Sequence, residues 1–231
     1  MHRRQANMST ETADWQKIKE YLEPKRSNYW IEEPSLTQKV FLKSETTEVL
    51  FGGAAGGGKS SALLMAALQY VDIPNYSAIL FRRTYADLAL PGALMDRFRE
   101  WVSEYDDVHW NSNMYTATFP SGARITFGYL NNVNDYLRYK GSEFQFIGMD
   151  EVTEIREADY RYMFSRLRRP ANGPLSTVPL RMRAATNPAP NWVRQRFLVE
   201  GKEHGRIFIP SKLTDNPGID PESYRAVLAE L

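Results

Sequence analysis

A glycine-rich stretch followed by Lys59 and Ser60 has the residue types and the spacing of a phosphate-binding loop. Gly53 and Gly58 enclose four residues, which gives the pattern G-x-x-x-x-G-K-S/T. Glycines tolerate the positive φ angles of a tight curl, in which consecutive backbone N–H groups converge on phosphate oxygens. In such a loop the lysine reaches the β- and γ-phosphates, and the serine hydroxyl binds Mg²⁺. We therefore expect nucleotide contacts from Gly53, Ala54, Ala55, Gly56, Gly57, Gly58, Lys59, Ser60 and Ser61.

Two adjacent acids form a second candidate for chemistry. Asp150 and Glu151 follow the apolar run 144–149 and lie about 90 residues beyond the loop. An aspartate at a strand end can hold Mg²⁺, and a neighbouring glutamate can orient and deprotonate the water that attacks a γ-phosphate. An isolated Asp-Glu pair is also common at exposed strand ends and at the start of helices. Its presence in one chain with the loop favours the catalytic interpretation, with Asp150 as a metal ligand and Glu151 as the base.

Polar residues at two other positions could also contact a nucleotide. Thr186, Asn187 and Pro188 directly follow the apolar run 180–185. The Thr and Asn side chains can hydrogen-bond a γ-phosphate or the attacking water, although Asn-Pro also starts plain turns. Gln38 stands shortly before the loop, where its amide can both donate to and accept from the edge of adenine. Most glutamines are simply exposed, so this interpretation of Gln38 depends on its position in the sequence.

These candidates need a scaffold that brings several strand ends together, and the hydrophobic pattern predicts one. Apolar runs of strand length alternate with helical segments, which is typical of an α/β protein with a mostly parallel sheet flanked by helices. Three short segments around a Pro-Ser-Gly turn predict an antiparallel β excursion at the sheet edge. The expected elements are parallel strands at 49–51, 77–81, 144–150, 180–185 and 206–210, antiparallel strands at 108–110, 115–119 and 124–129, and helices at 15–22, 62–68, 92–105, 158–168, 191–199 and 222–231.

Length and composition limit the alternatives. A chain of 231 residues with a hydrophobic fraction of 42% fits one packed α/β domain. The net charge is +1, but the segment 156–206 is rich in arginine and poor in acids, which predicts a local basic face. The absence of cysteine excludes a disulfide framework and a thiolate metal site. No apolar run is long enough for a bilayer and the start lacks a signal-peptide core, so we expect no membrane partner and a cytoplasmic setting.

Together, the loop, the acid pair and the Thr-Asn-Pro segment make this chain resemble the ATPase domain of the large terminase subunit, the DNA-packaging motor of tailed phages. The resemblance covers roughly residues 30–231. It implies a P-loop NTPase fold of the ASCE/RecA-like type that binds ATP and Mg²⁺. It also implies an N-terminal extension at 1–30, an ATPase core at 31–209 and the start of a small lid or linker at 210–231. The nuclease domain that usually follows in this family has no acidic cluster to represent it here. The residues that carry the resemblance are Gln38, 52–60, Asp150, Glu151, 185–188, 208–211 and 215–217.

The resemblance also assigns roles and partners. It implies that Gln38 reads adenine and that Thr186 and Asn187 form a coupling motif, which passes hydrolysis to movement on DNA. The implied partners are double-stranded DNA, identical subunits in a ring, a portal protein and a small terminase subunit. The implied location is the cytoplasm of the host.

The sequence departs from the family pattern at two places. Many family loops carry a basic residue inside the glycine turn, where this chain has Ala54 and Ala55. The family's trans-acting arginine finger corresponds to Lys140, and a lysine cannot form the bidentate fork of an arginine. We therefore expect Arg138 to be the finger, with Lys140 or the Arg82-Arg83 pair as alternatives. Because a trans finger raises turnover by about 10³- to 10⁵-fold, the isolated chain should hydrolyse ATP slowly.

The sequence thus predicts an enzyme that couples ATP hydrolysis to translocation of double-stranded DNA. Arginines in the second half of the chain would contact DNA phosphates without reading base sequence, although solubility or subunit contacts also explain many of them. One alternative is a helicase-type nucleic-acid translocase. Another is a nucleotide-gated module that docks on DNA or a portal and barely turns over. The arginines concerned are at positions 161, 166, 168, 169, 194 and 196.

Overall fold

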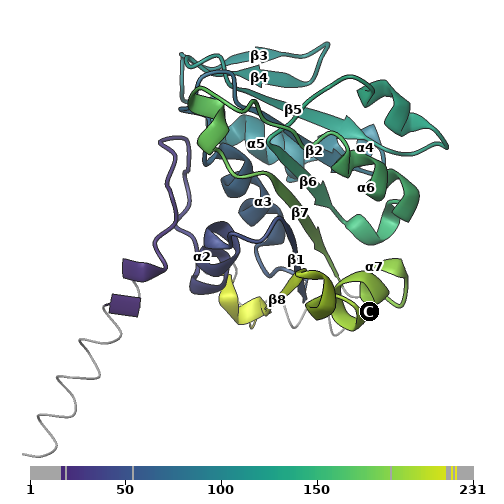
Figure 1. The fold of residues 1–231 in the computed structure, drawn as a ribbon. Coiled ribbons are helices and arrows are strands. Elements are labelled where there is room, and N and C mark those ends of the chain that lie inside the picture. Colours follow the sequence, from purple (N-terminus) through teal and green to yellow (C-terminus); the bar gives the residue numbers. More distant parts are fainter. Residues whose placement is uncertain are drawn as a thin grey trace, which may run out of the picture.

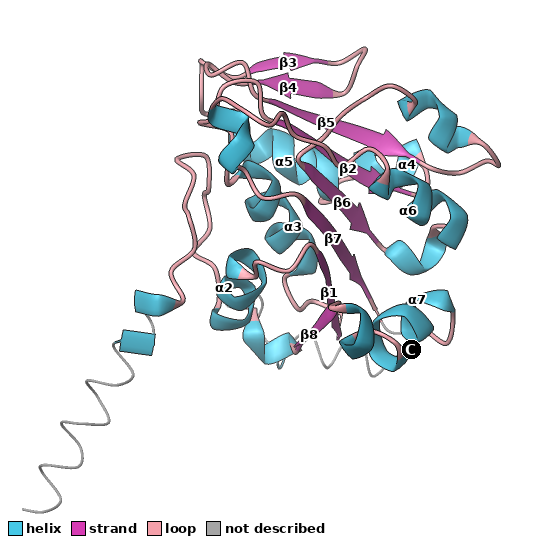
Figure 2. Cartoon of the chain, viewed as in Figure 1, coloured by secondary structure: helices cyan, strands magenta, loops and turns pink. Residues whose placement is uncertain are grey.

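The computed structural model describes residues 17–18, 20–53, 55–187, 189–216, 220 and 222. Within these residues, eight strands form one sheet in the order β3-β4-β5-β2-β6-β7-β1-β8, which runs from top to bottom in Figure 1. Helices flank the sheet (Figure 2). The strands are β1 Glu48–Gly53, β2 Ser77–Arg82, β3 His109–Asn111, β4 Thr116–Thr118, β5 Arg124–Tyr129, β6 Phe146–Asp150, β7 Arg181–Thr186 and β8 Ile207–Ser211. The helices are α2 Leu36–Lys43, α3 Lys59–Leu68, α4 Tyr85–Ala89, α5 Leu94–Val102, α6 Glu157–Phe164 and α7 Trp192–Arg194. This architecture confirms the predicted α/β class.

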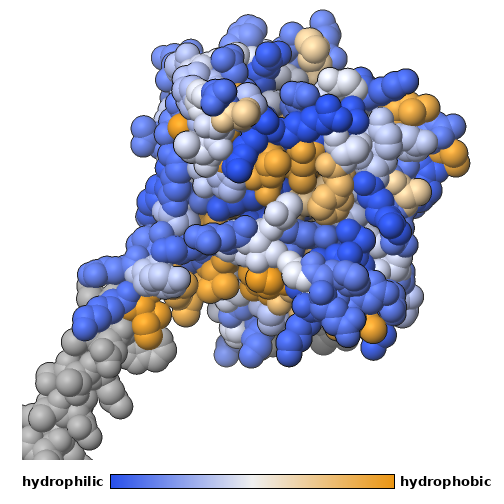
Figure 3. Space-filling model, viewed as in Figure 1, coloured by the Kyte–Doolittle hydropathy of each residue, from blue (hydrophilic) through white to orange (hydrophobic). Residues whose placement is uncertain are grey.

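The central strands are buried because helices cover both faces of the sheet. In β2, Leu80 contributes to the core that contains α3 and α5 residues, whereas Ile79 and Phe81 contribute to the core that contains α6 residues. A strand that is buried on both sides has no polar face, which explains the continuous apolar runs in the sequence. Figure 3 shows that hydrophilic residues cover most of one face of the molecule, with a few hydrophobic patches among them.

The strand order decides which strand ends meet. β7 pairs in parallel with β1 on one side and with β6 on the other. The register sets Gly52 of β1 beside Thr186, and Asp150 of β6 beside Ala185. The carboxyl ends of β1, β7 and β6 are therefore level at one edge of the sheet, where ligands bind in open α/β proteins.

The predicted β excursion lies at the edge of the sheet. β3 and β4 are antiparallel, and β4 is antiparallel to β5. β5 also pairs in parallel with β2, so the segment expected as a plain antiparallel strand is the boundary between the two parts of the sheet.

Several predicted helix boundaries were wrong, and local contacts explain why. The helix expected at 92–105 begins at Leu94, because Gly92 has a φ of 73°. The helix expected at 158–168 ends at Phe164, because the backbone at 166–168 instead pairs with Phe144. The helix expected at 191–199 is three residues of α7 followed by a π-helix, Gln195–Val199.

Two helices that the sequence analysis did not predict have clear local signals. Ser35 and Gln38 form a capping box at the start of α2, and Thr84 and Asp87 form one at the start of α4. No helix of the described residues combines the length and the hydrophobicity needed to cross a membrane. Parts of three predicted segments lie outside the described residues. They are the N-terminal extension up to residue 16, most of the lid segment beyond residue 216 and nearly all of the predicted helix 222–231.

Candidate nucleotide-binding and catalytic site

The glycine-rich loop connects β1 to α3, and two of its glycines are required by their surroundings. Gly53 has a φ of 147°, and a Cβ there would lie 2.0 Å from the carbonyl oxygen of Ser211 in β8. Gly58 has a φ of 70°, and its Cβ would lie 2.7 Å from Nε2 of Gln38. The loop therefore packs closely between β8 and α2. Glycine fits both positions, because it tolerates a positive φ and has no Cβ. Ala54 lies outside the described residues.

Two side-chain amides from outside the loop hold its carbonyl groups. Nε2 of Gln38 donates to the Gly58 oxygen at 2.9 Å, and Nδ2 of Asn216 donates to the Gly56 oxygen at 2.6 Å. In a trans peptide the N–H points away from the C=O, so the amides of Gly57 and Lys59 are directed away from these two side chains. Gly57 and Lys59 line a cavity, in which such N–H groups can contact a phosphate.

Gln38 serves the loop in a way that the sequence did not reveal. Its Oε1 accepts a hydrogen bond from the Ser35 backbone at 2.8 Å, while its Nε2 holds Gly58. The side chain is buried, with 3% of its surface exposed. An amide can take further partners, because it has two donor hydrogens and two acceptor lone pairs. A contact with adenine thus stays a prediction, whereas the contact with the loop is observed.

Lys59 begins α3 and is buried beside the acid pair. Burial lowers the pKa of its ammonium group, and the charges of Glu151 and Asp150 oppose this effect. The first turn of α3 contains no acidic side chain. The positive end of the helix dipole and a buried ammonium therefore lie together at the loop, which favours a bound anion.

Asp150 is the last residue of β6 and is almost fully buried. Its oxygens lie 3.2 and 3.4 Å from the Ser60 hydroxyl and 3.6 Å from Nη1 of Arg82. Burial raises the pKa of the Asp150 carboxyl to about 6, with a smaller rise from the Glu151 charge, while Arg82, Ser60 and Lys59 act in the opposite direction. A buried carboxylate whose pKa remains raised despite these neighbours has an incomplete set of partners.

The donors around Asp150 fit a magnesium ion that is shared with a ligand. The Ser60 hydroxyl and the Asp150 carboxylate are both hard oxygen donors, as Mg²⁺ prefers. The part of the chain that the structure describes has no group of three His, Cys, Asp or Glu residues suited to a metal. Mg²⁺ commonly takes one or two protein ligands and completes its shell with waters and substrate phosphates, so this small donor set suits it.

Glu151 has a strained backbone conformation. Its φ is 47° and its ψ is 51°, in the left-handed region that few residues other than glycine adopt. Such strain costs about 1–3 kcal/mol and persists where the surrounding structure imposes it. The Thr186 hydroxyl donates to Oε2 of Glu151 at 3.2 Å, and the hydroxyls of Thr186 and Thr153 are 2.7 Å apart. These contacts hold the Glu151 carboxylate at the edge of the sheet.

A cavity of about 670 Å³ brings most of the predicted residues together. Asp150 and Thr186 do not line it themselves, but they contact Ser60 and Glu151, which do. Gly53 anchors the base of the loop against β8. The predicted site residues that line the cavity are Gln38, Ala55, Gly56, Gly57, Gly58, Lys59, Ser60, Ser61, Glu151 and Asn187.

Two of the candidate finger residues, Arg138 and Lys140, do not line this cavity. Arg138 pairs with Asp135 at 2.9 Å, and its guanidinium lies 4.6 Å from the centre of the Tyr129 ring. Lys140 is exposed shortly after it. Arg82, by contrast, approaches Asp150 within the site. A finger acts on a neighbouring subunit, so the position of Arg138 in one chain leaves its role a prediction.

The arginine-rich segment is less accessible than its composition suggested. Arg183 is fully buried and donates to the backbone oxygens of residues 44, 46 and 47. Arg196 and Arg206 both pair with Glu48. The predicted basic face therefore has fewer accessible arginines than the composition implies. Arg196 is half-buried in its ion pair with Glu48, and its contact with DNA stays a prediction.

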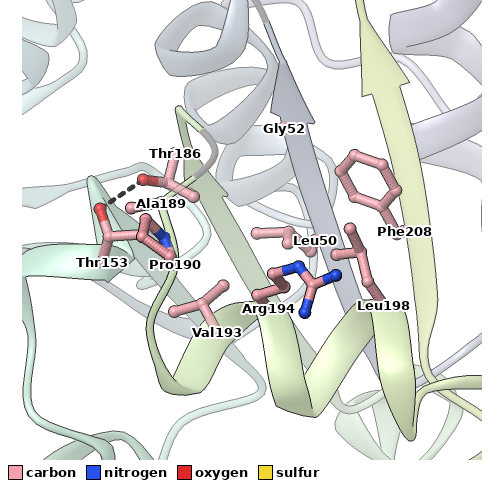
Figure 4. A pocket seen from close by; sticks show the side chains of 10 residues that line it. All are labelled: Leu50, Gly52, Thr153, Thr186, Ala189, Pro190, Val193, Arg194, Leu198 and Phe208. Carbon is pink, nitrogen blue, oxygen red and sulfur yellow. Dashed lines mark hydrogen bonds between the residues drawn. The ribbon is translucent and has the colours of Figure 1, made fainter.

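A second, mostly apolar cavity of about 240 Å³ lies beside Thr186 and Thr153, between α7 and the strands β1 and β8 (Figure 4). Leu50, Val193 and Phe208 contribute to its wall. Thr186 lines this cavity and its hydroxyl contacts Glu151, which lines the polar one.

Sequence reasoning missed three residues of the site. Asn216 supports the loop, Thr153 contacts the Thr186 hydroxyl, and Arg97 of α5 lines the polar cavity. Asn216 stands in a segment that the resemblance had already singled out, so a signal for it existed. Arg97 has no sequence signal, because its contact with the loop depends on how α5 packs against α3.

Comparison with known proteins gives one consistent result. Residues 50–173 match the family model described as "Terminase large subunit, T4likevirus-type, N-terminal". No curated protein sequence matches the chain.

Solved structures of phage terminases are similar in fold. The large terminase of a thermophilic bacteriophage has a TM-score of 0.69 and 14% identity, covering 87% of this chain and 51% of that one. The HK97 bacteriophage large terminase has a TM-score of 0.63 and 12% identity, covering 90% and 49%. The ATPase domain of the Thermus phage P74-26 large terminase has a TM-score of 0.57 and 14% identity, covering 87% and 89%. The chain spans about half the length of the first two of these proteins.

Proposed function

The chain belongs to the family of terminase large subunits, matching its N-terminal model, and from this membership we propose that it is an ATP-hydrolysing motor domain that moves double-stranded DNA. The large terminase of the thermophilic bacteriophage has been solved with ADP and with ATP-gamma-S, which supports an adenine nucleotide as the ligand of the phosphate loop. Under this proposal, residues 31–209 are the ATPase core, 1–30 an N-terminal extension and 210–231 the start of a lid.

One observation carries the proposal. Glu151 lines the same cavity as the phosphate loop and Lys59, and its carboxylate is held there by the Thr186 hydroxyl. A nucleotide bound by the loop would therefore have a carboxylate beside its terminal phosphate. In this position Glu151 orients the attacking water and accepts its proton, while Lys59 stabilises negative charge on the phosphate oxygens.

Ser60 and Asp150 are the residues that would hold Mg²⁺. When bound, the ion neutralises charge that develops on the phosphate oxygens. Thr186 and Asn187 would relay the state of the nucleotide. The contact of Thr186 with Glu151 and the position of Asn187 in the cavity wall support this role. Movement of DNA would follow from conformational changes at the end of β7.

The partners follow from family membership and belong to the proposal. We expect double-stranded DNA as the substrate that is moved, a ring of identical subunits, and docking to a portal protein and a small terminase subunit. The setting is then the cytoplasm of the phage host. Arg138 of a neighbouring subunit, or alternatively Lys140, would complete the site as a trans-acting finger.

The variant Glu151→Gln tests the proposal. It should bind Mg²⁺-ATP as well as the wild type but release phosphate about 10²- to 10⁴-fold more slowly, because a positioned general base contributes about that much. The matched control is Glu154→Gln, which changes an exposed glutamate of the adjacent turn and should leave both measurements unchanged. Equal phosphate release by Glu151→Gln and the wild type would overturn the proposal.

Phosphate release by the wild type, measured with and without DNA, separates the alternatives. Stimulation by double-stranded DNA supports a packaging motor, whereas stimulation by single strands alone indicates a helicase-type translocase. Negligible release under all conditions, together with normal ATP binding, indicates a nucleotide-gated module. Turnover that rises more than linearly with protein concentration supports a finger supplied by a neighbour, and a strictly proportional rise counts against it.

A further inference from the structure

Helix α5 brings a second cationic side chain to the cavity of the phosphate loop. Arg97 lines this cavity together with Glu100 and Trp101 of the same helix. Its Nη1 donates to the Ser61 hydroxyl at 3.1 Å. Ser61 directly follows Lys59 and Ser60 in the first turn of α3, so a guanidinium stands beside the turn whose N–H groups face a bound phosphate.

The position of Arg97 results from the packing of α5. Leu94, Phe98 and Trp101 are buried in the core that also contains the apolar residues of α3, and the two helices are in contact. Arg97 immediately precedes Phe98 and is half-buried at the margin of this contact. Its direction toward Ser61 is thus imposed by the core and not by a charged partner.

Arg97 makes no ion pair with the described residues, and its side-chain hydrogen bond goes to the Ser61 hydroxyl. Three glutamates line the same cavity, namely Glu32, Glu33 and Glu100. Glu33 pairs with Arg26, and none of the three forms an ion pair with Arg97. The first turn of α3 is free of acidic side chains, and its backbone N–H groups already carry partial positive charge. A guanidinium beside this helix end adds to the attraction for an anion bound at the first turn of α3.

The distribution of polar groups indicates which phosphate Arg97 would meet. Ser60 contacts Asp150, and Thr186 contacts Glu151, so this side of the loop suits the terminal phosphate and the metal. Ser61 lies one residue farther along α3 than Ser60, and Arg97 of α5 contacts it there. We propose that Arg97 binds the α-phosphate of the nucleotide and sets its affinity without taking part in hydrolysis. This inference rests on the proposed function.

The variant Arg97→Ala tests the role by comparing ATP with ADP. Both nucleotides contain the α-phosphate, so the affinities for both, measured by calorimetry with Mg²⁺, should fall by a similar factor of about 10 to 100. In steady-state phosphate release, KM should rise and kcat should stay within about threefold. Arg97→Lys should recover part of the affinity, because it retains the charge but not the fork of donors.

The matched control is Arg99→Ala. Arg99 is on the same helix, is exposed, and its guanidinium lies over the Trp110 ring outside the cavity, so its removal should leave nucleotide affinity unchanged. Unchanged affinities of Arg97→Ala, or a loss confined to ATP or to kcat, would overturn the inference. If Lys59→Ala abolishes binding while Arg97→Ala is silent, the proposed function stands and this inference fails. Absence of nucleotide binding by the wild type would overturn both.

Discussion

Two buried carboxylates, at opposite ends of the parallel strands, have very different surroundings. Glu48 begins β1, and its oxygens accept from Arg196 at 2.5 and 3.1 Å, from Arg206 at 3.1 Å and from the Tyr160 hydroxyl at 3.0 Å. Asp150 ends β6 and has one ion pair of 3.6 Å with Arg82 and a serine hydroxyl. Since β1 and β6 are both parallel to β7, the start of β1 and the end of β6 lie at opposite ends of the strands.

The comparison separates a structural site from a binding site. Two guanidinium groups and a phenol satisfy the Glu48 carboxylate, so this cluster connects β1 to the π-helix, to the residue that precedes β8 and to α6. The Asp150 carboxylate keeps a raised pKa because burial outweighs its partners. A buried acid with complete partners stabilises the fold, whereas one with incomplete partners retains affinity for a ligand at a cost in stability.

Of the changes considered, breaking the Glu48 cluster should have the largest effect, and this effect is on the free energy of unfolding. Glu48→Ala leaves two half-buried arginines facing an empty position, and removing one partner of a buried pair costs about 3–5 kcal/mol. Urea or thermal unfolding should show this loss in the free energy of unfolding. The control Glu157→Gln removes an exposed pair with Arg161 and should cost less than about 1 kcal/mol. A stable Glu48→Ala protein would show that the cluster is not structural.

Asp150→Asn should change how the free energy of unfolding depends on pH. Folded Asp150 holds its proton up to about pH 6, whereas an unfolded aspartate releases it near the ordinary value of 3.8. The folded state therefore binds more protons in this window, and the free energy of unfolding should fall as pH rises from about 4 to about 6, by about 2–3 kcal/mol. Asp150→Asn should remove this step and lose ATP hydrolysis.

Thermal unfolding from pH 4 to pH 8 in the absence of Mg²⁺ and nucleotide measures the effect. The relevant quantity is the difference between the variant and the wild type, because other carboxylates also titrate in this range. A difference in stability between variant and wild type that stays constant from pH 4 to pH 8 would contradict the raised pKa of Asp150.

Thr186→Val should have an intermediate effect that is confined to catalysis. The valine lacks the hydroxyl that donates to Glu151, and a hydrogen bond to a charged group corresponds to about a 10- to 100-fold change in kcat. Thr186→Ser keeps the donor and should restore most of the rate. Thr153→Val removes a contact one step farther from Glu151 and should have a smaller effect. Equal rates for the valine and serine variants at position 186 would exclude this positioning role.

Asn216→Ala should have the smallest effect. Losing one neutral hydrogen bond to the Gly56 carbonyl should weaken ATP binding by about 2- to 10-fold, because the loop is less well ordered before the ligand binds. Asn113→Ala, in the exposed turn between β3 and β4, is the control. An affinity equal to that of the control would mean that Gln38 alone is sufficient to hold the loop.

Much of this site could be predicted from local sequence, and the exceptions are informative. The loop, the acid pair and the Thr-Asn end were all visible, because each combines a short motif with an apolar strand pattern. The burial of Arg183 in the arginine-rich segment had no signal, because composition does not distinguish a buried arginine from an exposed one. The left-handed backbone of Glu151 had no signal, since nothing in the residue type requires it.

The sequence by itself determined most element types and the chemistry of the strand ends at the site, because hydrophobic periodicity and glycine spacing are local properties of the chain. Only the tertiary structure decided that β7 lies between β1 and β6, that Asn216 and Gln38 hold the loop from two sides, and that Arg97 reaches Ser61. These contacts join residues that are distant in the sequence. They depend on strand order and helix packing, which are set by burial of the whole core and not by any single segment.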